Sequence, residues 1–195
     1  MKYILASASP RRKELLKQMG LVFETIPACG EEEIRFDAPE EIVMDLSRQK
    51  AVEISEKRKE KVNAEIIIGA DTVVALDGEI LGKPKDAEDA YRMLSMLQGR
   101  NHKVYTGVTC IKKDRGIEKQ HSFYEETEVA MYPMTEEEIR WYIGTKEPFD
   151  KAGGYGIQGR CAVFIKEIHG DYNNVVGLPA ARLYQEFKKL GIAIY

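Results

Sequence analysis

The chain of 195 residues is long enough to bury a hydrophobic core without disulfide bonds. Hydrophobic residues make up 44% of it and charged residues 31%, and this composition excludes a disordered chain and a membrane-spanning bundle. The net charge of -3 lacks the strongly basic character of a domain that binds duplex nucleic acid, so we expect no nucleic acid partner.

The N-terminal half opens on an apolar run, Tyr3 to Ala6, that predicts a strand. This run is too short for a signal peptide or a membrane span, so we expect a cytoplasmic protein with no membrane partner. Further elements follow from helical or strand-like recurrence of apolar residues. They are a helix through Leu15, Leu16 and Met19 to Gly20, a helix from Ala38 to about Lys61 with a charged tail from Glu56, strands at Ile66–Ile68 and Val73–Leu76 joined to Ile80 by a turn at Asp77-Gly78, and a helix capped by Asp86 that ends at Leu97.

The C-terminal half alternates strands and helices in the same way. Two strands, Val104 to Cys110 and Phe123 to Met131, flank a turn at Asp114–Gly116. Interleaved helices and strands, without a repeat or linker, predict an α/β fold with a mixed sheet in one domain, residues 1–195. The remaining predicted elements are a helix with a capping box at Thr135 and Glu138, a core residue Trp141 and an end at Gly144, strands at Ala162–Ile168 and Tyr172–Val176, and a helix from Pro179 to Leu190.

The cysteines and histidines show no metal-ligand spacing. Cys29, Cys110 and Cys161 form no Cys-x-x-Cys pair, which predicts buried reduced thiols. Cys161 lies beside a glycine-rich segment, so a reactive thiol is the alternative there. The histidines His102, His121 and His169 are expected on loops or at strand ends.

The segment after the first strand contradicts a rule of helix electrostatics. Ser9 and Pro10 suit the cap and first position of a helix, but Arg11 and Arg12 then put two cations in its first turn. The helix dipole disfavours each by about 0.3–1 kcal/mol. A bound phosphate would reverse that effect, with Ser7, Ser9 and both guanidinium groups as donors. The alternative is that Ser9 only caps the helix and the arginines lie in solvent.

Two acidic segments could hold a metal ion or a catalytic water. Asp71 interrupts an apolar strand in Gly69-Ala70-Asp71-Thr72, where a buried carboxylate needs a partner. Backbone N–H groups are its alternative partners. The other segment holds Glu31, Glu32 and Glu33 on a loop, which could equally be a solvated acidic surface.

Cations and a glycine-rich segment could complete a site. Lys83 follows the hairpin after Asp71, and Lys50 lies on the second helix, where a plain surface role is the alternative. The segment Asp150–Arg160 includes Lys151 and is rich in glycine, which suits close approach of backbone to a ligand. Gln158 within it can both donate and accept, as reading the edge of a base requires, or it can bond within a turn.

Together these segments resemble the Maf family of nucleotide pyrophosphatases, which shares its architecture with the inosine triphosphatases. The resemblance implies an elongated mixed sheet with flanking helices, in two lobes around a central nucleotide cleft, and a homodimer. It rests on five segments in order: Leu5-Ala6-Ser7-x-Ser9-Pro10-Arg11-Arg12, Gly69-Ala70-Asp71-Thr72-Val73, Gly82-Lys83-Pro84, Asp150-Lys151-Ala152-Gly153-x-Tyr155-Gly156-Ile157-Gln158-Gly159 and Val176-Gly177-Leu178-Pro179.

The resemblance also implies roles for individual residues. A nucleoside triphosphate would be cleaved between its α and β phosphates with Mg²⁺ or Mn²⁺, and Asp71 matches the family's proton acceptor. Glu32 or a neighbour would serve the metal or the water. The triphosphate would be held by Ser7, Ser9, Arg11, Arg12 and Lys83, with Lys50 and Lys151 nearby, and pyrimidine selectivity for dTTP and UTP, extending to modified pyrimidine nucleotides, would come from Arg11, Thr72 and Gln158.

A different class of function remains open at this point. The family has been linked to arrest of septum formation in cell division. The same site could therefore bind a nucleotide as a signal and hydrolyse none of it.

Overall fold

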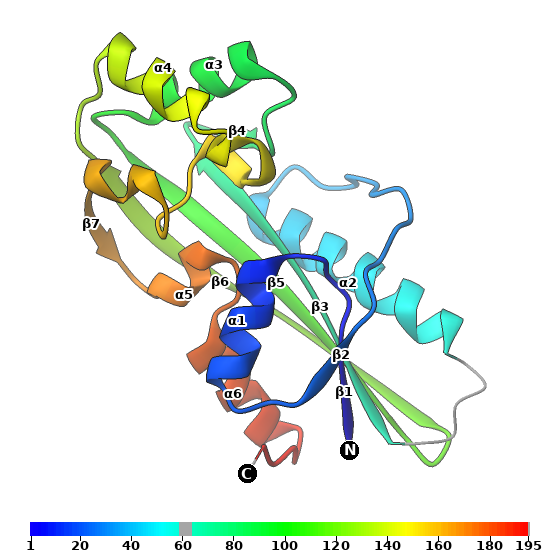
Figure 1. The fold of residues 1–195 in the computed structure, drawn as a ribbon. Helices are drawn as coiled ribbons and strands as arrows, with labels where there is room; N and C mark the ends of the chain where they lie inside the picture. The colour runs from blue at the N-terminus through cyan, green and yellow to red at the C-terminus, as the bar shows by residue number, and fades with distance from the viewer. Residues whose placement is uncertain (59–63, 195) are drawn as a thin grey trace. The chain divides into compact units, whose positions relative to one another are not determined.

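The computed structural model describes residues 1–58 and 64–194, and within them seven strands form one mixed sheet. The strand order is β2-β1-β3-β5-β6-β7, and β4 pairs with β3 (Figure 1). Strand β1 is parallel to β2 and β3, whereas the pairs β3–β4 and β6–β7 are antiparallel. The strands are β1 (Lys2–Leu5), β2 (Phe23–Thr25), β3 (Glu65–Leu76), β4 (Glu79–Leu81), β5 (Asn101–Asp114), β6 (Ile117–Met131) and β7 (Ile165–His169).

Helices flank this sheet, which confirms the predicted α/β class with a mixed sheet. The predicted caps are confirmed at Ser9, Asp86 and Thr135, the last with both bonds of its capping box. No helix within residues 1–58 and 64–194 is long and apolar enough to cross a membrane. The helices are α1 (Pro10–Gln18), α2 (Pro39–Lys57), α3 (Ala87–Leu97), α4 (Glu136–Gly144), α5 (Tyr172–Val176) and α6 (Ala180–Lys189), with 3-10 helices at Glu147–Asp150, Ala152–Gly154 and Arg160–Phe164.

The chain divides into two compact units, and β3, β5 and β6 contribute residues to both. The expectation of one domain with two lobes around a nucleotide cleft stays a prediction. Unit 1 comprises Met1–Asp71, Thr106–Glu125 and Gly177–Tyr195, and unit 2 comprises Thr72–Tyr105 and Glu126–Val176.

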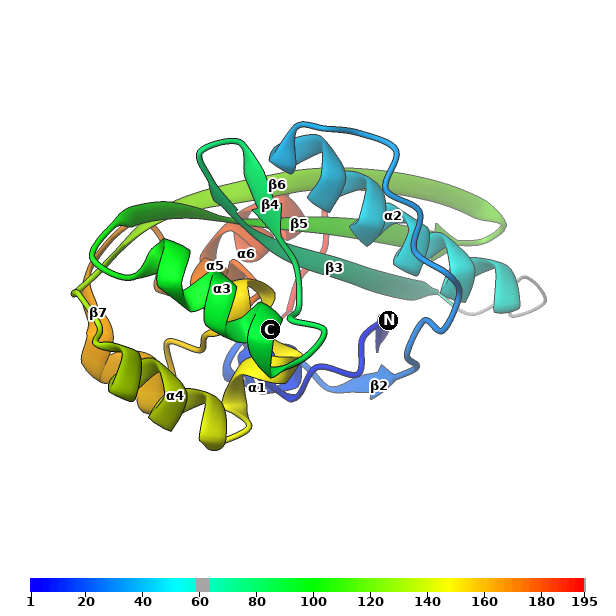
Figure 2. The same ribbon diagram turned by 90° about the horizontal axis from the view of Figure 1, so that it is seen from above.

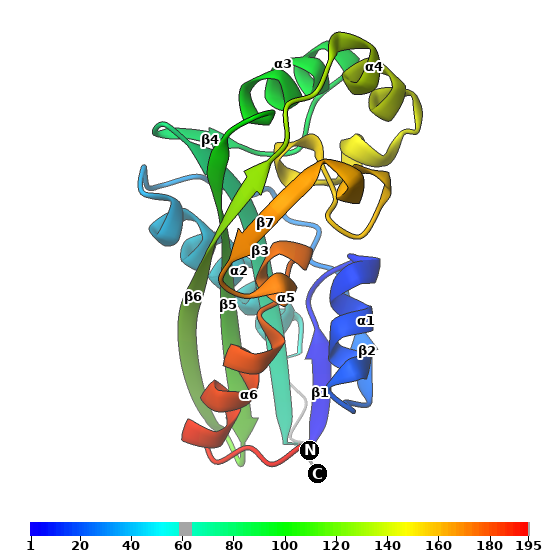
Figure 3. The ribbon, with the colours of Figure 1, turned by 90° about the vertical axis from the view of Figure 1, so that its left-hand side faces the viewer.

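In unit 1, helices α2 and α6 cover opposite faces of β1. Ile4 of β1 belongs to a buried cluster with Ala51 and Ile54 of α2. The next residue toward the N-terminus, Tyr3, packs its ring 6.0 Å from that of Phe187 in α6. Successive strand residues point to opposite faces, so the two helices enclose β1 between them. Figure 3 shows α6 beside the strands and α1 beside β1 and β2.

Helix α2 approaches the sheet so closely that two strand positions have no room for a side chain. A Cβ atom on Gly69 of β3 would lie 2.2 Å from the carbonyl oxygen of Ser47. On Gly107 of β5 it would lie 2.2 Å from the carbonyl oxygen of Val43. These two glycines therefore set the distance between the helix and the strands, which run side by side in Figure 2.

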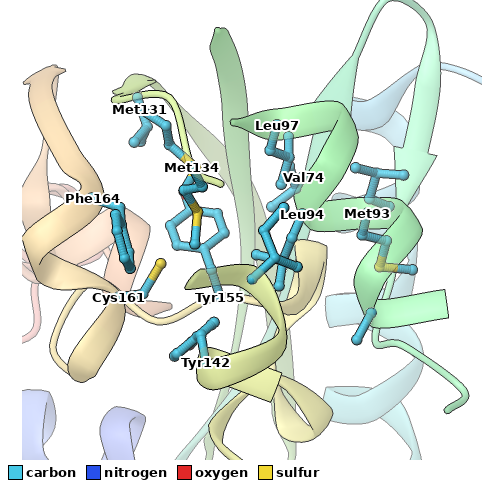
Figure 4. Close-up of a cluster of buried hydrophobic side chains, with 14 of the residues drawn as sticks. Val74, Met93, Leu94, Leu97, Met131, Met134, Tyr142, Tyr155, Cys161 and Phe164 are labelled. Carbon is cyan, nitrogen blue, oxygen red and sulfur yellow. The ribbon is translucent and has the colours of Figure 1, made fainter. Parts of the chain in front are cut away.

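Unit 2 has its own core between α3, α4 and its strands. Leu94 and Leu97 of α3 are fully buried with Tyr142 of α4. The cluster also includes Cys161 and Tyr155 from the segment after α4 (Figure 4). The glycine-rich segment is thus anchored in a hydrophobic core.

The structure corrects several expectations for individual elements. The predicted strand Tyr172–Val176 is helix α5, and its first turn is stabilised by Asp171, whose carboxylate accepts a bond of 2.8 Å from the Asn173 N–H. The predicted strand Ala162–Ile168 begins only at Ile165, after a 3-10 helix. The short parallel strand β2 was not predicted, because its three residues are too few for a periodic pattern.

Three single residues also differ from expectation. Trp141 is wrong as a core residue, since 51% of it is exposed, while Ile139, Tyr142 and Ile143 share the buried face of α4. Cys29 is exposed, and the other two cysteines are buried as predicted. His121 lies inside β6. Helix α2 ends at Lys57, and residues 59–61 of the predicted helix and its charged tail lie outside the described residues.

The buried carboxylate of Glu186 links α6 to β6. Its lowered pKa makes the free energy of unfolding depend on pH. Glu186 is 1% exposed and accepts bonds from His121 (2.9 Å), Arg182 (2.7 Å) and Lys189 (2.8 Å). Burial raises the pKa of Glu186, but these three bonds outweigh it and lower the pKa from 4.5 to about 2. The stabilisation is therefore present above pH 4.5 and is lost as the pH falls through about 2.

We expect Glu186→Gln to lower the free energy of unfolding at neutral pH by roughly 2–4 kcal/mol. Urea denaturation at several pH values measures this effect. The pH dependence between 4.5 and 2 should flatten in the variant, because the titrating group is gone. Glu14→Gln, which changes an exposed glutamate of α1, is the matched control. An unchanged pH slope in Glu186→Gln would contradict the assignment.

Candidate functional site

Hydrogen bonds shape the loop between β1 and α1, at the carboxyl end of β1. The N–H of Ala6 donates 2.8 Å to the Ile68 carbonyl, the last link between β1 and β3 before the chain turns into the loop. The buried Ser7 hydroxyl accepts from the Ser9 N–H at 3.3 Å. Ser9 caps α1 by accepting from the Arg12 N–H at 3.5 Å. The predicted helix start is therefore confirmed.

Arg12 donates hydrogen bonds to two other parts of the protein. Its Nε donates to the Gly177 carbonyl at 2.8 Å and a terminal nitrogen donates to the Ser7 hydroxyl at 3.2 Å. Burial lowers the pKa of Arg12, while the nearby carboxylates of Asp71 and Glu32 act in the opposite direction. Arg12 thus links the loop before α1 to Gly177, ahead of α6. Its charge also interacts with the carboxylates of Asp71 and Glu32.

Lys50 of α2 joins the two predicted acidic segments. Its ammonium forms an ion pair with Asp71 of β3 and lies 3.0 Å from a carboxylate oxygen of Glu32. The side chains of Lys50 and Asp71 are each only 14% exposed. Asp71 lies two residues beyond Gly69, on the strand face that α2 approaches. The close approach at Gly69 therefore brings the lysine to the carboxylate.

The three glutamates of the acidic loop have different surroundings. Glu33 bonds to Arg35 at 2.5 Å, and Glu32 bonds to Lys50. Glu31 lines a pocket of about 180 Å³ together with Glu32 and Lys50. Among the three, Glu32 is the one paired with the lysine that also holds Asp71, so the structure brings together Glu32, Lys50 and Asp71.

Two side chains of α2 that the sequence analysis missed hold this loop. Glu53 accepts from the N–H groups of Cys29 and Gly30, each at 3.0 Å. Gln49 accepts from the Glu33 N–H at 3.1 Å and donates to the Glu33 carbonyl at 2.8 Å. Gln49 and Glu53 are four residues apart and Lys50 lies three before Glu53, so Gln49 and Lys50 both neighbour Glu53 on the helix surface, which is the only signal in the sequence.

In unit 2, the remaining predicted residues lie on or near the glycine-rich segment. The Gly153 N–H donates 3.0 Å to the Gly82 carbonyl, so exposed Lys83 adjoins this segment. Lys151 donates to the Glu147 carbonyl at 2.6 Å and to Asp150 at 2.7 Å, which ties its ammonium to the segment itself. Gln158 is exposed.

Buried polar groups shape that segment around its glycines. His102 of β5 bonds to the Tyr155 hydroxyl at 2.7 Å, and the Tyr142 hydroxyl accepts from the Gly156 N–H at 3.1 Å. Gly153 has a φ of +68° and packs against Val74, so a side chain there would be both strained and crowded. Half-buried Thr72, the residue after Asp71, begins this unit.

The residues around Lys50 fit a divalent cation that also binds phosphate oxygens. Within residues 1–58 and 64–194 no group of three or more His, Cys, Asp or Glu could hold a metal. However, the carboxylates of Asp71 and Glu32 already converge on one cationic group. Mg²⁺ commonly takes one or two carboxylates and completes its coordination with substrate phosphates and water. Asp71 and Glu32 are thus the residues that would hold such an ion.

The fold and this cluster define an α/β protein with serine and arginine groups at the carboxyl end of a parallel strand, where open α/β sheets bind ligands, and with a lysine paired with two carboxylates. The model of the Maf-like protein family matches residues 2–190, and the chain belongs to this family.

The chain is also similar over nearly its full length to relatives named for an enzymatic activity. The chain is 59% identical to a dTTP/UTP pyrophosphatase of Agathobacter rectalis, over 98% of each chain. It is 54% identical to one of Carboxydothermus hydrogenoformans, over 98% of this chain and 100% of that one.

Two solved structures show a more distant likeness. The Ham1 protein of Staphylococcus aureus aligns at 15% identity and a TM-score of 0.44, over 98% of this chain and 100% of that one. A nucleoside-triphosphatase, also described as a dITP/XTP pyrophosphatase, of Mycobacterium abscessus aligns at 14% identity and a TM-score of 0.39, over 69% and 76% of the two chains.

Proposed function

We propose that the chain is a nucleoside triphosphate pyrophosphatase that hydrolyses dTTP and UTP, and also modified pyrimidine nucleotides, to the monophosphate and pyrophosphate. The observation that carries this proposal is the 59% identity, over 98% of each chain, to a relative named for dTTP and UTP. The pairing of Lys50 with Asp71 and Glu32 supports it, because phosphate chemistry requires cations and carboxylates close together.

In this proposal Asp71 is the group that orients the attacking water and accepts its proton. The water oxygen forms a bond to the α phosphorus, the bond from that phosphorus to the bridging oxygen breaks, and pyrophosphate leaves. Glu32 assists at the same water or at a divalent ion, Mg²⁺ or Mn²⁺. When bound by Asp71 and Glu32, that ion would neutralise phosphate charge. Lys50 holds both carboxylates in position.

The other predicted residues bind the substrate. Ser7, Ser9, Arg11 and Arg12 would hold the triphosphate from the loop before α1, because free N–H groups and guanidinium groups at a helix start favour anions. Arg12 would do so partly through the Ser7 hydroxyl, to which it donates. Lys83 and Lys151 would add positive charge. Arg11, Thr72 and Gln158 would select the pyrimidine base.

The competing function, a nucleotide-binding regulator of septum formation without turnover, is not favoured, since the relatives are named for an activity. Pyrophosphate release from a panel of canonical and modified nucleotides, with Mg²⁺ or Mn²⁺ added, tests the proposal. We expect release to be fastest with dTTP and UTP and to stop when EDTA removes the metal. A protein that binds these nucleotides and releases no pyrophosphate would refute hydrolysis.

A homodimer and a cytoplasmic location complete the proposal. Light scattering of the purified protein measures the oligomeric state, and a monomer at micromolar concentration would contradict the dimer. The cytoplasmic assignment is supported by the cysteines, since Cys29, Cys110 and Cys161 are all free thiols. Fractionation of cells that produce the protein tests it.

A further inference from the structure

Side chains of α2 hold the backbone on both sides of Glu32 through four hydrogen bonds. Residues 31–36 belong to no helix or strand. Ahead of Glu32, each oxygen of the Glu53 carboxylate accepts one backbone N–H, from Cys29 and from Gly30. After Glu32, Gln49 both accepts from and donates to the backbone of Glu33. The loop is therefore fixed at both sides of a single residue.

Helix geometry aligns these holding groups with Lys50. Residues 49 and 53 are four apart and so are neighbours on the helix surface, and residue 50 lies three before residue 53. The same helix turn thus supplies the two side chains that hold the loop and the ammonium that receives the Glu32 carboxylate at 3.0 Å. Lys50 in turn pairs with Asp71. One rigid helix face therefore fixes the position of both carboxylates.

Glu53 is kept in its charged form by its surroundings. The N–H of Cys29, followed by the ammonium of Lys57 at 2.5 Å, lowers the pKa of Glu53 to about 2. The close approach is visible at Gly30, where an added Cβ would lie 3.1 Å from a Glu53 oxygen. The holding bonds are charge-assisted, which makes them stronger than neutral ones.

We propose that Gln49 and Glu53 are positioning residues that hold the loop on either side of Glu32 and so deliver the Glu32 carboxylate to Lys50 beside Asp71. This inference rests on the proposed function. It also selects Glu32, over Glu31 and Glu33, as the functional glutamate. Neither Gln49 nor Glu53 would touch the substrate, and each would act only through Glu32.

Hydrogen–deuterium exchange tests the holding of the loop without any activity measurement. In Glu53→Gln the amides of Cys29 and Gly30 should exchange about ten- to a hundredfold faster, the factor that corresponds to losing a hydrogen bond to a charged group. In Gln49→Met the amide of Glu33 should exchange faster instead. Glu41→Gln removes the same charge from an exposed position on the same helix and should leave all three amides unchanged. Unchanged exchange in Glu53→Gln would overturn the proposal.

A double-mutant cycle on the turnover of dTTP separates positioning from general stabilisation. We expect Glu53→Gln to lower kcat by about tenfold in the wild-type background, and by less than about twofold once Glu32→Gln is present, because coupled residues are not additive. An equal loss of kcat in both backgrounds would overturn the proposal, since Glu53 would then act independently of Glu32. Thermal unfolding of each variant shows that the folded state is being compared.

Failure of the proposed hydrolysis and failure of the positioning role would give different results. A wild-type protein that releases no pyrophosphate from dTTP or UTP would refute the proposed function, and the delivery of Glu32 for catalysis would fall with it. The exchange experiment would still decide whether Gln49 and Glu53 hold the loop. Active wild-type protein with additive losses of kcat would refute the positioning role and leave the proposed function intact.

Discussion

Asp71→Asn is expected to lower kcat for dTTP and UTP by about 10²–10⁴-fold, the range typical of a lost general base. Asparagine keeps the size of the side chain and an oxygen that can accept from Lys50, but it cannot accept a proton from water at neutral pH. It also removes one of the two carboxylates that would hold a divalent ion. Binding of the nucleotide should be affected less than turnover, because the proposed triphosphate donors remain in place.

The measurement is pyrophosphate release at saturating nucleotide, together with thermal unfolding of the same preparation. Unfolding should shift only modestly, since the half-buried ion pair with Lys50 becomes a weaker hydrogen bond. Asp114→Asn, at the exposed last residue of β5, is the matched control and should retain full activity. Full turnover by a correctly folded Asp71→Asn variant would rule out the catalytic assignment.

Gly69→Ala is expected to destabilise the protein by about 3 kcal/mol or more, the upper range for overpacking a core. The added Cβ would lie 2.2 Å from the Ser47 carbonyl oxygen and 2.9 Å from the Ala51 nitrogen. Both are backbone atoms of α2, so no side chain can rotate away to make room. The helix would have to move from the strand, and the pairing of Lys50 with Asp71 would be lost with it.

Urea denaturation of Gly69→Ala measures this loss, and turnover by the fraction that remains folded should fall as well. Gly144→Ala is the matched control, because nothing lies within 4 Å of its added Cβ. Gly144 ends α4, where alanine should be neutral or stabilise the helix by roughly 0.5–1 kcal/mol. If Gly69→Ala unfolded like the wild type, the close approach of α2 to β3 would be incorrect.

Much of the fold could be predicted from local sequence patterns. The caps at Ser9, Asp86 and Thr135 and the turn at Asp77-Gly78 depend on short-range hydrogen bonds and backbone preferences, which neighbouring residues decide. The helix α5 was missed for the opposite reason. Its apolar and β-branched residues suit a strand, but buried Asn174 donates to Thr127 of β6 at 2.9 Å, a contact between residues 47 apart in the chain.

The residues of the candidate site could also be named from the sequence, because each stands out against its local pattern. Two arginines in the first turn of α1 and an acid within an apolar strand are unfavourable unless another group compensates for them. Such conflicts identify residues, but they do not say which side chains meet. The five matching segments were sufficient for the family, to which the model match over residues 2–190 now assigns the chain.

By itself, then, the sequence determined the α/β class, the family and the residues that break local rules. Only the tertiary structure decided that Lys50 lies between Asp71 and Glu32, and that Gln49 and Glu53 hold the acidic loop. The physical reason is that local patterns record hydrogen bonds and burial within a few residues, whereas these contacts depend on how closely a helix approaches a strand. That distance is set by Gly69 and Gly107, which are far from the acidic loop in sequence.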